Sequence, residues 1–303
     1  MKTIALTGAT SITGLALIRQ CIQNNVNVIT FVRPNSKNIT RLPNSNLITK
    51  VKCDLENIKG TDLPKNASKA DVFFHIGWIN NTKQERDSSS AQTANIPCAI
   101  DTVHLAKKME CSKYIYLGSQ AEVGLVNEPI NQNTKINPVT INGIFKYAAG
   151  KITNIECKQL GLEHIWVRLV SEYGSHDHED RLIKQFIKNC KDNIPMNLSN
   201  CSHIWDYLYE DDVGEALFLT GKKGFGGKIY ILGSGIGRPL REYLDIIINK
   251  VNPDYMPNYG AVEYNESSIK FLTADISEIK KDTGWYPKTS FEKGIDAVIK
   301  DIL

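Results

Sequence analysis

The chain has 303 residues, of which 42% are hydrophobic and 23% are charged, and its net charge is +3. These values predict a soluble globular protein with one large domain, or a large and a small one, and they argue against nucleic acid or a membrane surface as partner. Seven scattered cysteines without a CxxC pair, no apolar run of about 18 residues and no N-terminal leader predict a cytoplasmic protein with reduced thiols and no metal site.

The first segment predicts a strand, a tight turn and a helix. Residues 4–6 form an apolar run typical of a strand buried on both faces, and apolar residues recur at helical spacing after Gly14. Gly8 permits a sharp turn after the strand, and Gly14 lets the helix pack close to it. The free N–H groups and the partial positive charge at the start of such a helix suit a pyrophosphate. We therefore expect a dinucleotide to bind here; the alternative is a βα turn without a ligand.

The turn over residues 7–14, TGATSITG, resembles the TGxxGxxG fingerprint of the extended short-chain dehydrogenase/reductase family. That family includes the NAD(P)-dependent nucleotide-sugar epimerases, dehydratases and ketoreductases. The resemblance implies an α/β fold, a doubly wound parallel (Rossmann) sheet over residues 1–168, with a smaller C-terminal α/β substrate domain over residues 169–303. Ser11 replaces the middle glycine, and its hydroxyl could donate to a phosphate. The implied cofactor contacts from this turn are Gly8, Thr10, Ser11, Ile12 and Gly14.

The end of the second predicted strand, residues 26–32, indicates which dinucleotide binds. An acidic residue there would bond the ribose 2′-hydroxyl of NAD, but the strand is followed by Arg33, which can clamp a 2′-phosphate. We therefore expect NADP(H), with NAD as the alternative; a solvated surface arginine would also fit. Asp54 and Leu55, after a third strand over residues 47–51, resemble the family's pair beside the adenine, although Asp54 could be an ordinary loop aspartate.

The fourth predicted strand, residues 70–77, resembles the family segment beneath the nicotinamide ribose and pyrophosphate. Gly77 keeps the close approach that this position needs, whereas Trp78 is bulky and is expected to form a wall of the substrate pocket. His75 is expected to be a core residue. A helix over residues 92–108 follows, and Asn95 lies where the family has an asparagine that supports the active site.

After the fifth predicted strand, residues 113–117, Ser119 resembles the family's catalytic Ser/Thr. Its hydroxyl lies beyond a strand carboxyl end, where it could bond a substrate alcohol or carbonyl. Dehydratases of the family carry an acidic pair directly after this residue, but here Gln120 and Ala121 follow, which argues against 4,6-dehydration. Glu122 could replace that pair only with a changed loop. Gln120 and Glu122 are expected to line the substrate site.

The family's chemistry needs a tyrosine and a lysine four residues apart, because this spacing places both on one face of a helix. Tyr147 and Lys151 have that spacing, but the family pattern, aligned from Pro138, places Asn142 at the tyrosine and Lys146 at the lysine. Tyr147 would then point about 140° away from Asn142 and pack against the sheet or a neighbouring subunit. We expect Asn142 and Lys146 to be the catalytic pair, with Lys146 also holding the cofactor.

An asparagine at this position leaves three outcomes open, because an amide does not titrate near neutral pH. The protein binds NADP(H) and a nucleotide sugar but turns over slowly; it uses another acid, such as Ser119, Glu122 or water; or it is a silent relative that senses or scaffolds.

The second half resembles the substrate-binding part of the family. Strands are predicted over residues 163–168 and 228–232, the latter returning to the sheet, and helices over residues 181–190, 213–220 and 241–251. The acidic and histidine run of residues 176–180 is expected to be a solvated loop, not a metal site. Asp212 is expected to cap the helix that begins at Val213. The implied substrate contacts, besides Trp78, are Trp205, Tyr207 and Arg238, where Arg238 would bind the diphosphate or be a surface arginine.

The resemblance covers nearly the whole chain and implies NADP(H)-dependent redox chemistry at C4 of a nucleotide-linked sugar, as a ketoreductase or an epimerase. The rivals are a cofactor-binding scaffold and a reductase of a non-sugar carbonyl. A homodimer is expected by family analogy alone.

Overall fold

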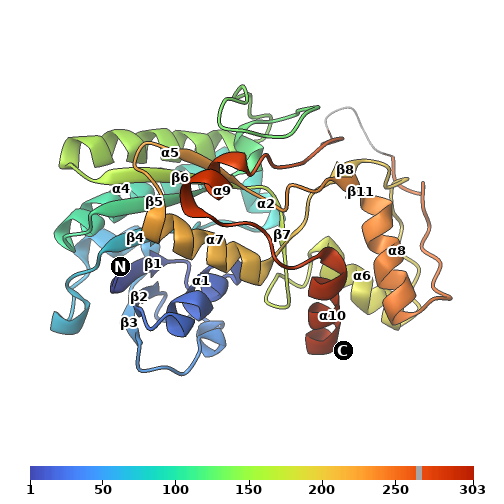
Figure 1. The fold of residues 1–303 in the computed structure, drawn as a ribbon, viewed down its shortest axis with the longest axis horizontal. Coiled ribbons are helices and arrows are strands. Elements are labelled where there is room, and N and C mark those ends of the chain that lie inside the picture. Colours follow the sequence, from blue (N-terminus) through green and yellow to red (C-terminus); the bar gives the residue numbers. More distant parts are fainter. Residues whose placement is uncertain (264–267) are drawn as a thin grey trace.

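The computed structural model describes residues 1–263 and 268–303, and a seven-stranded parallel sheet is its centre (Figure 1). The strand order is β10-β6-β5-β4-β1-β2-β3, and every pair in it is parallel. The strands are β1 Thr3–Thr7, β2 Asn27–Val32, β3 Ile48–Lys52, β4 Val72–His75, β5 Lys113–Ser119, β6 Glu163–Leu169 and β10 Ile229–Leu232. The order reverses between β1 and β4, and in such sheets ligands lie beyond the carboxyl ends of the strands at this point.

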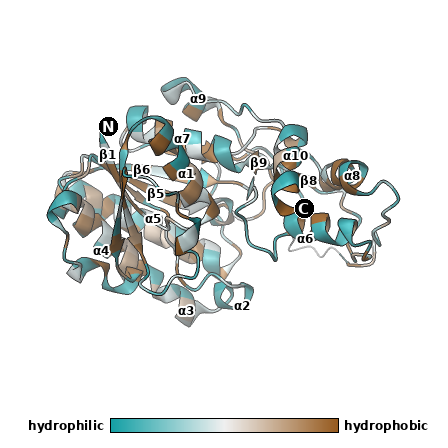
Figure 2. Cartoon of the chain, turned by 90° about the horizontal axis from the view of Figure 1, so that it is seen from below, coloured by the Kyte–Doolittle hydropathy of each residue, from teal (hydrophilic) through white to brown (hydrophobic). Residues whose placement is uncertain are grey.

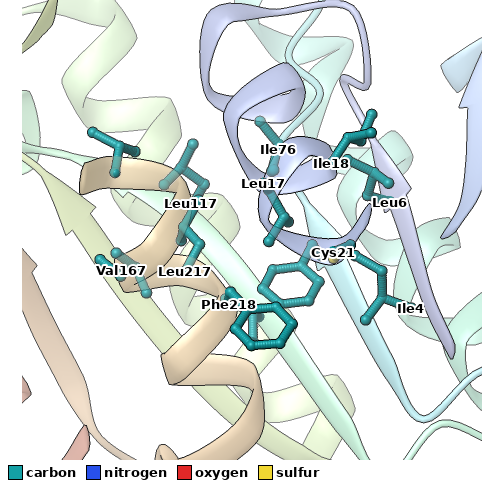
Figure 3. Close-up of a cluster of buried hydrophobic side chains, with 14 of the residues drawn as sticks. Ile4, Leu6, Leu17, Ile18, Cys21, Ile76, Leu117, Val167, Leu217 and Phe218 are labelled. Carbon is teal, nitrogen blue, oxygen red and sulfur yellow. The ribbon is translucent and has the colours of Figure 1, made fainter. Parts of the chain in front are cut away.

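Helices cover both faces of the sheet, as the doubly wound prediction required. On one face α1 (Ile12–Gln23) packs against α7 (Glu210–Lys223), and Leu17 and Ile18 belong to the same buried cluster as Leu217 and Phe218 (Figure 3). On the other face lie α4 (Asn95–Lys108) and α5 (Ile141–Leu160), over a core rich in aromatic side chains. Within residues 1–263 and 268–303, no helix has the length and apolar character needed to cross a bilayer.

A second hydrophobic core lies beyond the sheet, at the right in Figure 2. It is built from α6 (Leu182–Lys191), α8 (Leu240–Val251) and α10 (Phe291–Ile302). Two short pairs of strands connect the two parts: parallel β7 (Glu172–Tyr173) and β9 (Leu208–Tyr209), and antiparallel β8 (Ile204–Trp205) and β11 (Arg238–Pro239). The remaining helices are α2 (Lys83–Arg86), α3 (Ser89–Thr93) and α9 (Ser277–Thr283). The chain returns to the sheet with β10, which pairs with β6.

The predicted role of Asp212 was wrong. The helix α7 begins at Glu210, so Asp212 lies inside its first turn. Its carboxylate accepts hydrogen bonds from the backbone N–H groups of Lys288 (3.1 Å) and Thr289 (2.9 Å), which attaches the C-terminal segment to α7. A contact between residues so distant in the chain leaves no local sequence signal.

Candidate active site

The turn between β1 and α1 has the close geometry that its glycines predicted. Gly8 has a φ of +73°, and a Cβ there would lie 2.7 Å from the backbone nitrogen of Gly77. A Cβ at Gly14 would lie 2.2 Å from the carbonyl oxygen of Gly8. Both positions therefore require glycine, one for its conformation and contact and the other for the close approach of helix to strand.

Ser11 is the N-cap of α1, and this changes its expected role. Its Oγ donates to the carbonyl of Gly8 at 2.8 Å and accepts from the N–H of Gly14 at 3.1 Å. The sequence analysis suggested that this hydroxyl could donate to a phosphate. In the structure its proton is used inside the turn instead. Since the Leu15 N–H bonds the Ser11 carbonyl, the N–H groups of Ile12 and Thr13 are the ones left for an anion at this helix end.

A substitution tests the glycine geometry. We expect Gly14→Ala to destabilise the protein by about 1–3 kcal/mol, because the new methyl group overlaps a backbone oxygen that has no room to move. The measurement is urea unfolding of the full chain. Gly60→Ala is the matched control, since nothing lies within 4 Å of a Cβ at Gly60. Equal stabilities of the two variants would contradict the packing described here.

The predicted adenosine end is a hollow of about 520 Å³ beyond β2 and β3. Arg33 and Asp54 line it, and so does Lys37, which sequence reasoning missed although it follows Arg33 by four residues. Leu55 begins the short helical turn over residues 55–60 beside it. Two cations therefore border the place where the sequence analysis expected one.

The predicted catalytic pair lies on one side of α5, facing Trp78. The Lys146 Nζ donates to the Leu117 carbonyl at 3.1 Å and lies 4.1 Å from the centre of the Trp78 ring. Burial lowers the pKa of Lys146 to about 8. The Asn142 Nδ2 donates to the Gln92 Oε1 at 3.0 Å.

Gln92 joins this group of side chains, and sequence reasoning missed it. It is fully buried, and its Oε1 also accepts from the Trp78 indole at 2.9 Å. Its Nε2 donates to the carbonyls of Asn80 (2.7 Å) and Glu85 (3.0 Å). Asn95 bonds both backbone groups of Ile79, at 2.9 and 3.1 Å. These bonds fix the loop that carries Trp78.

Tyr147 points the other way. Its ring centre lies 5.8 Å from that of Trp166 in β6, so the prediction that Tyr147 packs against the sheet is confirmed. His75 was expected in the core, and it is buried with its Nδ1 3.0 Å from the Thr7 hydroxyl. Burial lowers its pKa to about 3, so the ring is neutral.

Ser119 ends β5 and caps the turn formed by residues 120–122. Its Oγ accepts from the N–H of Ala121 at 3.2 Å, and its own N–H donates to Glu122 at 2.9 Å. The start of α5 packs on this turn, because a Cβ at Gly143 would lie 2.2 Å from the Ala121 carbonyl. Ser119 and the predicted pair, Asn142 and Lys146, therefore lie on elements that pack against each other. Gln120 is half-buried beside it, with an enclosed Oε1 that bonds no described residue.

The expectation that Glu122 lines the substrate site was wrong. Its side chain is fully buried and forms an ion pair with Arg168, with 2.7 Å between Oε2 and Nε. Its other oxygen accepts from Ser119, as described above. The carboxylate is therefore turned into the protein and held there by charge and hydrogen bonding.

The predicted substrate residues of the second half lie together near the β8–β11 pair. Trp205 is paired with Arg238 across these strands, and its indole donates to Ser171 at 3.1 Å. The ring of Tyr207 packs 5.2 Å from that of Tyr243. Arg238 is not free, because its Nη1 lies 2.6 Å from Glu292 of α10, so a diphosphate would have to compete with that carboxylate.

A buried acid lies next to the turn that would hold the pyrophosphate. The Thr13 hydroxyl donates to the Glu172 Oε1 at 2.7 Å, and the enclosed Oε2 has no hydrogen-bond partner among the described residues. Burial raises the pKa of Glu172 from 4.5 to about 8, and the carboxylates of Asp177 and Glu210 add to the rise. Asp177 is itself buried, so the run of residues 176–180 is less solvated than expected.

This raised pKa gives a pH prediction. The unfolded chain releases the Glu172 proton near pH 4.5 while the folded protein keeps it, so wild-type stability falls as pH rises from about 4.5 to about 8 and levels off above. We expect Glu172→Gln to remove this loss, so that the variant gains stability over the wild type between about pH 5 and about pH 9. Urea unfolding of both proteins at pH 5 and pH 9 measures this gain. If the stability difference between Glu172→Gln and the wild type were the same at both pH values, the raised pKa of Glu172 would be contradicted.

Comparisons of the sequence and of the structure with known proteins all find nucleotide-sugar epimerases and dehydratases. A sequence model of the NAD dependent epimerase/dehydratase family matches residues 4–233. A Methanocaldococcus jannaschii protein with the provisional name UDP-glucose 4-epimerase is 23% identical, over 98% of this chain and 97% of its own. The structure of Thermotoga maritima UDP-glucose 4-epimerase with UDP-glucose has a TM-score of 0.86 at 18% identity, covering 99% of this chain and 98% of that chain. The structure of Streptomyces venezuelae dTDP-glucose 4,6-dehydratase with NAD has a TM-score of 0.87 at 17% identity, covering 99% and 96%.

The two solved structures confirm the fold, a Rossmann sheet with a C-terminal extension. The family match covers the turn at Gly8, the strand end at Ser119 and the pair on α5 in a single span. The chain therefore belongs to the NAD dependent epimerase/dehydratase family.

Proposed function

We propose that the protein uses NADP(H) to carry out redox chemistry at C4 of a nucleotide-linked sugar, as a 4-ketoreductase or an epimerase rather than a dehydratase. The observation that carries this proposal is the arrangement of Ser119, Asn142 and Lys146 on elements that pack against each other, in a chain whose first turn is built for a pyrophosphate. The named relatives act on or bind UDP- and dTDP-sugars, which supports a nucleotide sugar as substrate.

The residues present fit a dinucleotide. The Gly8 turn has no room for a side chain, and the N–H groups of Ile12 and Thr13 are free at the start of α1. The hollow at Arg33 would take the adenosine end. Bound there, the cofactor would supply or accept a hydride. Lys146 would hold the nicotinamide ribose, and the Ser119 hydroxyl would bond the sugar oxygen at C4. Asn142 can orient that oxygen but does not carry its proton.

The geometry of Glu122 supports reduction or epimerisation over dehydration. Dehydration needs carboxyl groups that move protons at the sugar, and in this turn the nearest carboxylate is buried against Arg168. Gln120 cannot take over, because an amide does not titrate near neutral pH.

The cofactor preference is a separate prediction. We expect Arg33→Ser/Lys37→Ser to weaken NADPH binding by about 10²- to 10⁴-fold, because the double variant removes two charge-assisted hydrogen bonds to the 2′-phosphate, each contributing about 1.5–3 kcal/mol. NADH binding should change little. Calorimetric titration of both dinucleotides measures this, with Lys69→Ser, an exposed lysine paired with Glu110, as control. Equal losses for NADPH and NADH would contradict a 2′-phosphate site.

The alternative function is a catalytically silent member that binds cofactor and regulates or scaffolds. Asn142 favours it, because the amide is held by Gln92 and supplies no proton. The deciding experiment incubates the full chain with NADPH and a panel of nucleotide-linked 4-keto sugars and measures NADPH loss and the C4 configuration of the product. Turnover supports the enzyme; tight binding of both ligands without turnover supports the alternative; no binding of either dinucleotide overturns both. Homodimerisation and a cytoplasmic location stay predictions.

A further inference from the structure

A second cavity lies on the opposite side of α5 from Asn142 and Lys146. It has a volume of about 140 Å³ and is lined by residues of α5, of β6 and β10 at the edge of the sheet, and of the loop over residues 132–136. Tyr147 and Lys151 of α5 line it, each five residues after a member of the catalytic pair and so turned about 140° away from that member. The cavity is therefore separate from the proposed active site.

The lining of this cavity is cationic. It contains Arg168, Lys151 and Lys228 and no acidic residue. Lys228 is compensated by Glu278 at 2.7 Å and by Asp282 at 3.8 Å. The exposed Lys151 has no ion-pair partner within residues 1–263 and 268–303. The aromatic rings of Tyr147 and Trp166 form one wall, and Gln132 and Thr134 supply polar groups from the loop.

Arg168 gives the second, independent observation. Its side chain is 2% exposed, and its Nε donates to Glu122. Its Nη1 is enclosed and bonds no described residue, although a guanidinium nitrogen carries strong donors. Leaving such a donor unpaired inside a protein is costly, and an oxyanion is the group that a guanidinium pairs with best.

We propose that this cavity binds a small oxyanion, a carboxylate or a phosphate, between Arg168 and Lys151. The carboxylate or phosphate oxygens would accept from the free donors of Arg168, and the ammonium of Lys151 would close the site from the solvent side. The rings of Tyr147 and Trp166 leave an apolar wall for whatever carries the anion. This site does not depend on the proposed function, because it shares no side chain with the cofactor or sugar sites.

The test uses the full chain, labelled with ¹⁵N at the tryptophan indoles and titrated separately with inorganic phosphate, acetate and benzoate. We expect the Trp166 indole resonance, assigned with Trp166→Phe, to move in a saturable way with at least one of them. The arm that saturates at the lowest concentration identifies phosphate, a plain carboxylate or an aromatic carboxylate as the preferred class.

Charge reversal locates the site. Lys151→Glu should weaken the binding by about tenfold or more, since it replaces an attracting charge by a repelling one. Lys158→Glu, the same change on an exposed residue of α5 outside the cavity, should not. The proposal is overturned if no saturable shift of Trp166 appears at tens of millimolar, or if Lys151→Glu and Lys158→Glu lose the same affinity. It is also overturned if only Lys37→Glu abolishes binding, which would place the anion at the cofactor hollow.

Discussion

Replacing Asn142 by tyrosine is expected to raise the rate of C4 reduction by about 10²- to 10⁴-fold, the range that a positioned general acid contributes. The site already holds the other parts this acid needs. Lys146 lies one helical turn away, and its positive charge would lower the pKa of a phenol at position 142. The Gln92 oxygen that now accepts from the Asn142 amide at 3.0 Å could accept from the new hydroxyl. The measurement is NADPH consumption with the nucleotide 4-keto sugar that binds best.

Two controls make this prediction specific. Asn142→Phe has nearly the size of tyrosine without its hydroxyl and should stay as slow as the wild type. Lys146→Met in the Asn142→Tyr background should lose most of the gain, because the phenol would keep its ordinary pKa. If instead the wild type turns over rapidly and Tyr147→Phe abolishes that activity, the alignment that places Asn142 at the tyrosine position is wrong, and Tyr147 must reach the site in the working enzyme.

The sequence predicted the sheet and its helices because these elements have local signals. A strand buried on both faces, such as β1, is a continuous apolar run. The glycines that follow it indicate a tight turn. The elements missed by the sequence analysis are short or are defined by distant contacts. The two-residue strands β8 and β11 are defined by their pairing, of Trp205 with Arg238 and of Ile204 with Pro239, and no local pattern indicates such a pair.

In the candidate site, too, the features with local sequence signals were predictable and those that depend on distant contacts were not. The proximity of Asn142 and Lys146 follows from helical spacing, and the position of Ser119 from the end of a strand, so both were predictable. The role of Gln92 was not, because the four residues that its side chain bonds, Trp78, Asn80, Glu85 and Asn142, lie 7 to 50 residues away along the chain. The mistake at Glu122 has the same cause, since its partner Arg168 lies 46 residues further along the chain.

Glu122→Ala is expected to destabilise the protein by about 3–5 kcal/mol, the cost of leaving one member of a buried ion pair without its partner. Arg168 is 1% exposed and has no other carboxylate within 4 Å among the described residues, so its charge would remain in the interior. The free energy of urea unfolding measures the loss. Glu110→Ala, which breaks the exposed pair with Lys69, is the control and should cost at most about 1 kcal/mol.

The double variant Glu122→Met/Arg168→Met separates charge from packing. If the cost of Glu122→Ala comes from the stranded guanidinium, removing both charges should restore most of the stability, because apolar side chains of similar volume can replace a buried ion pair. Glu122→Gln adds the functional test, since the amide preserves the shape of the side chain and an oxygen that can accept from Ser119. A stable Glu122→Gln protein with unchanged turnover would agree with a structural carboxylate. A stable Glu122→Gln protein without turnover would make Glu122 the proton carrier and would reopen dehydration as the reaction.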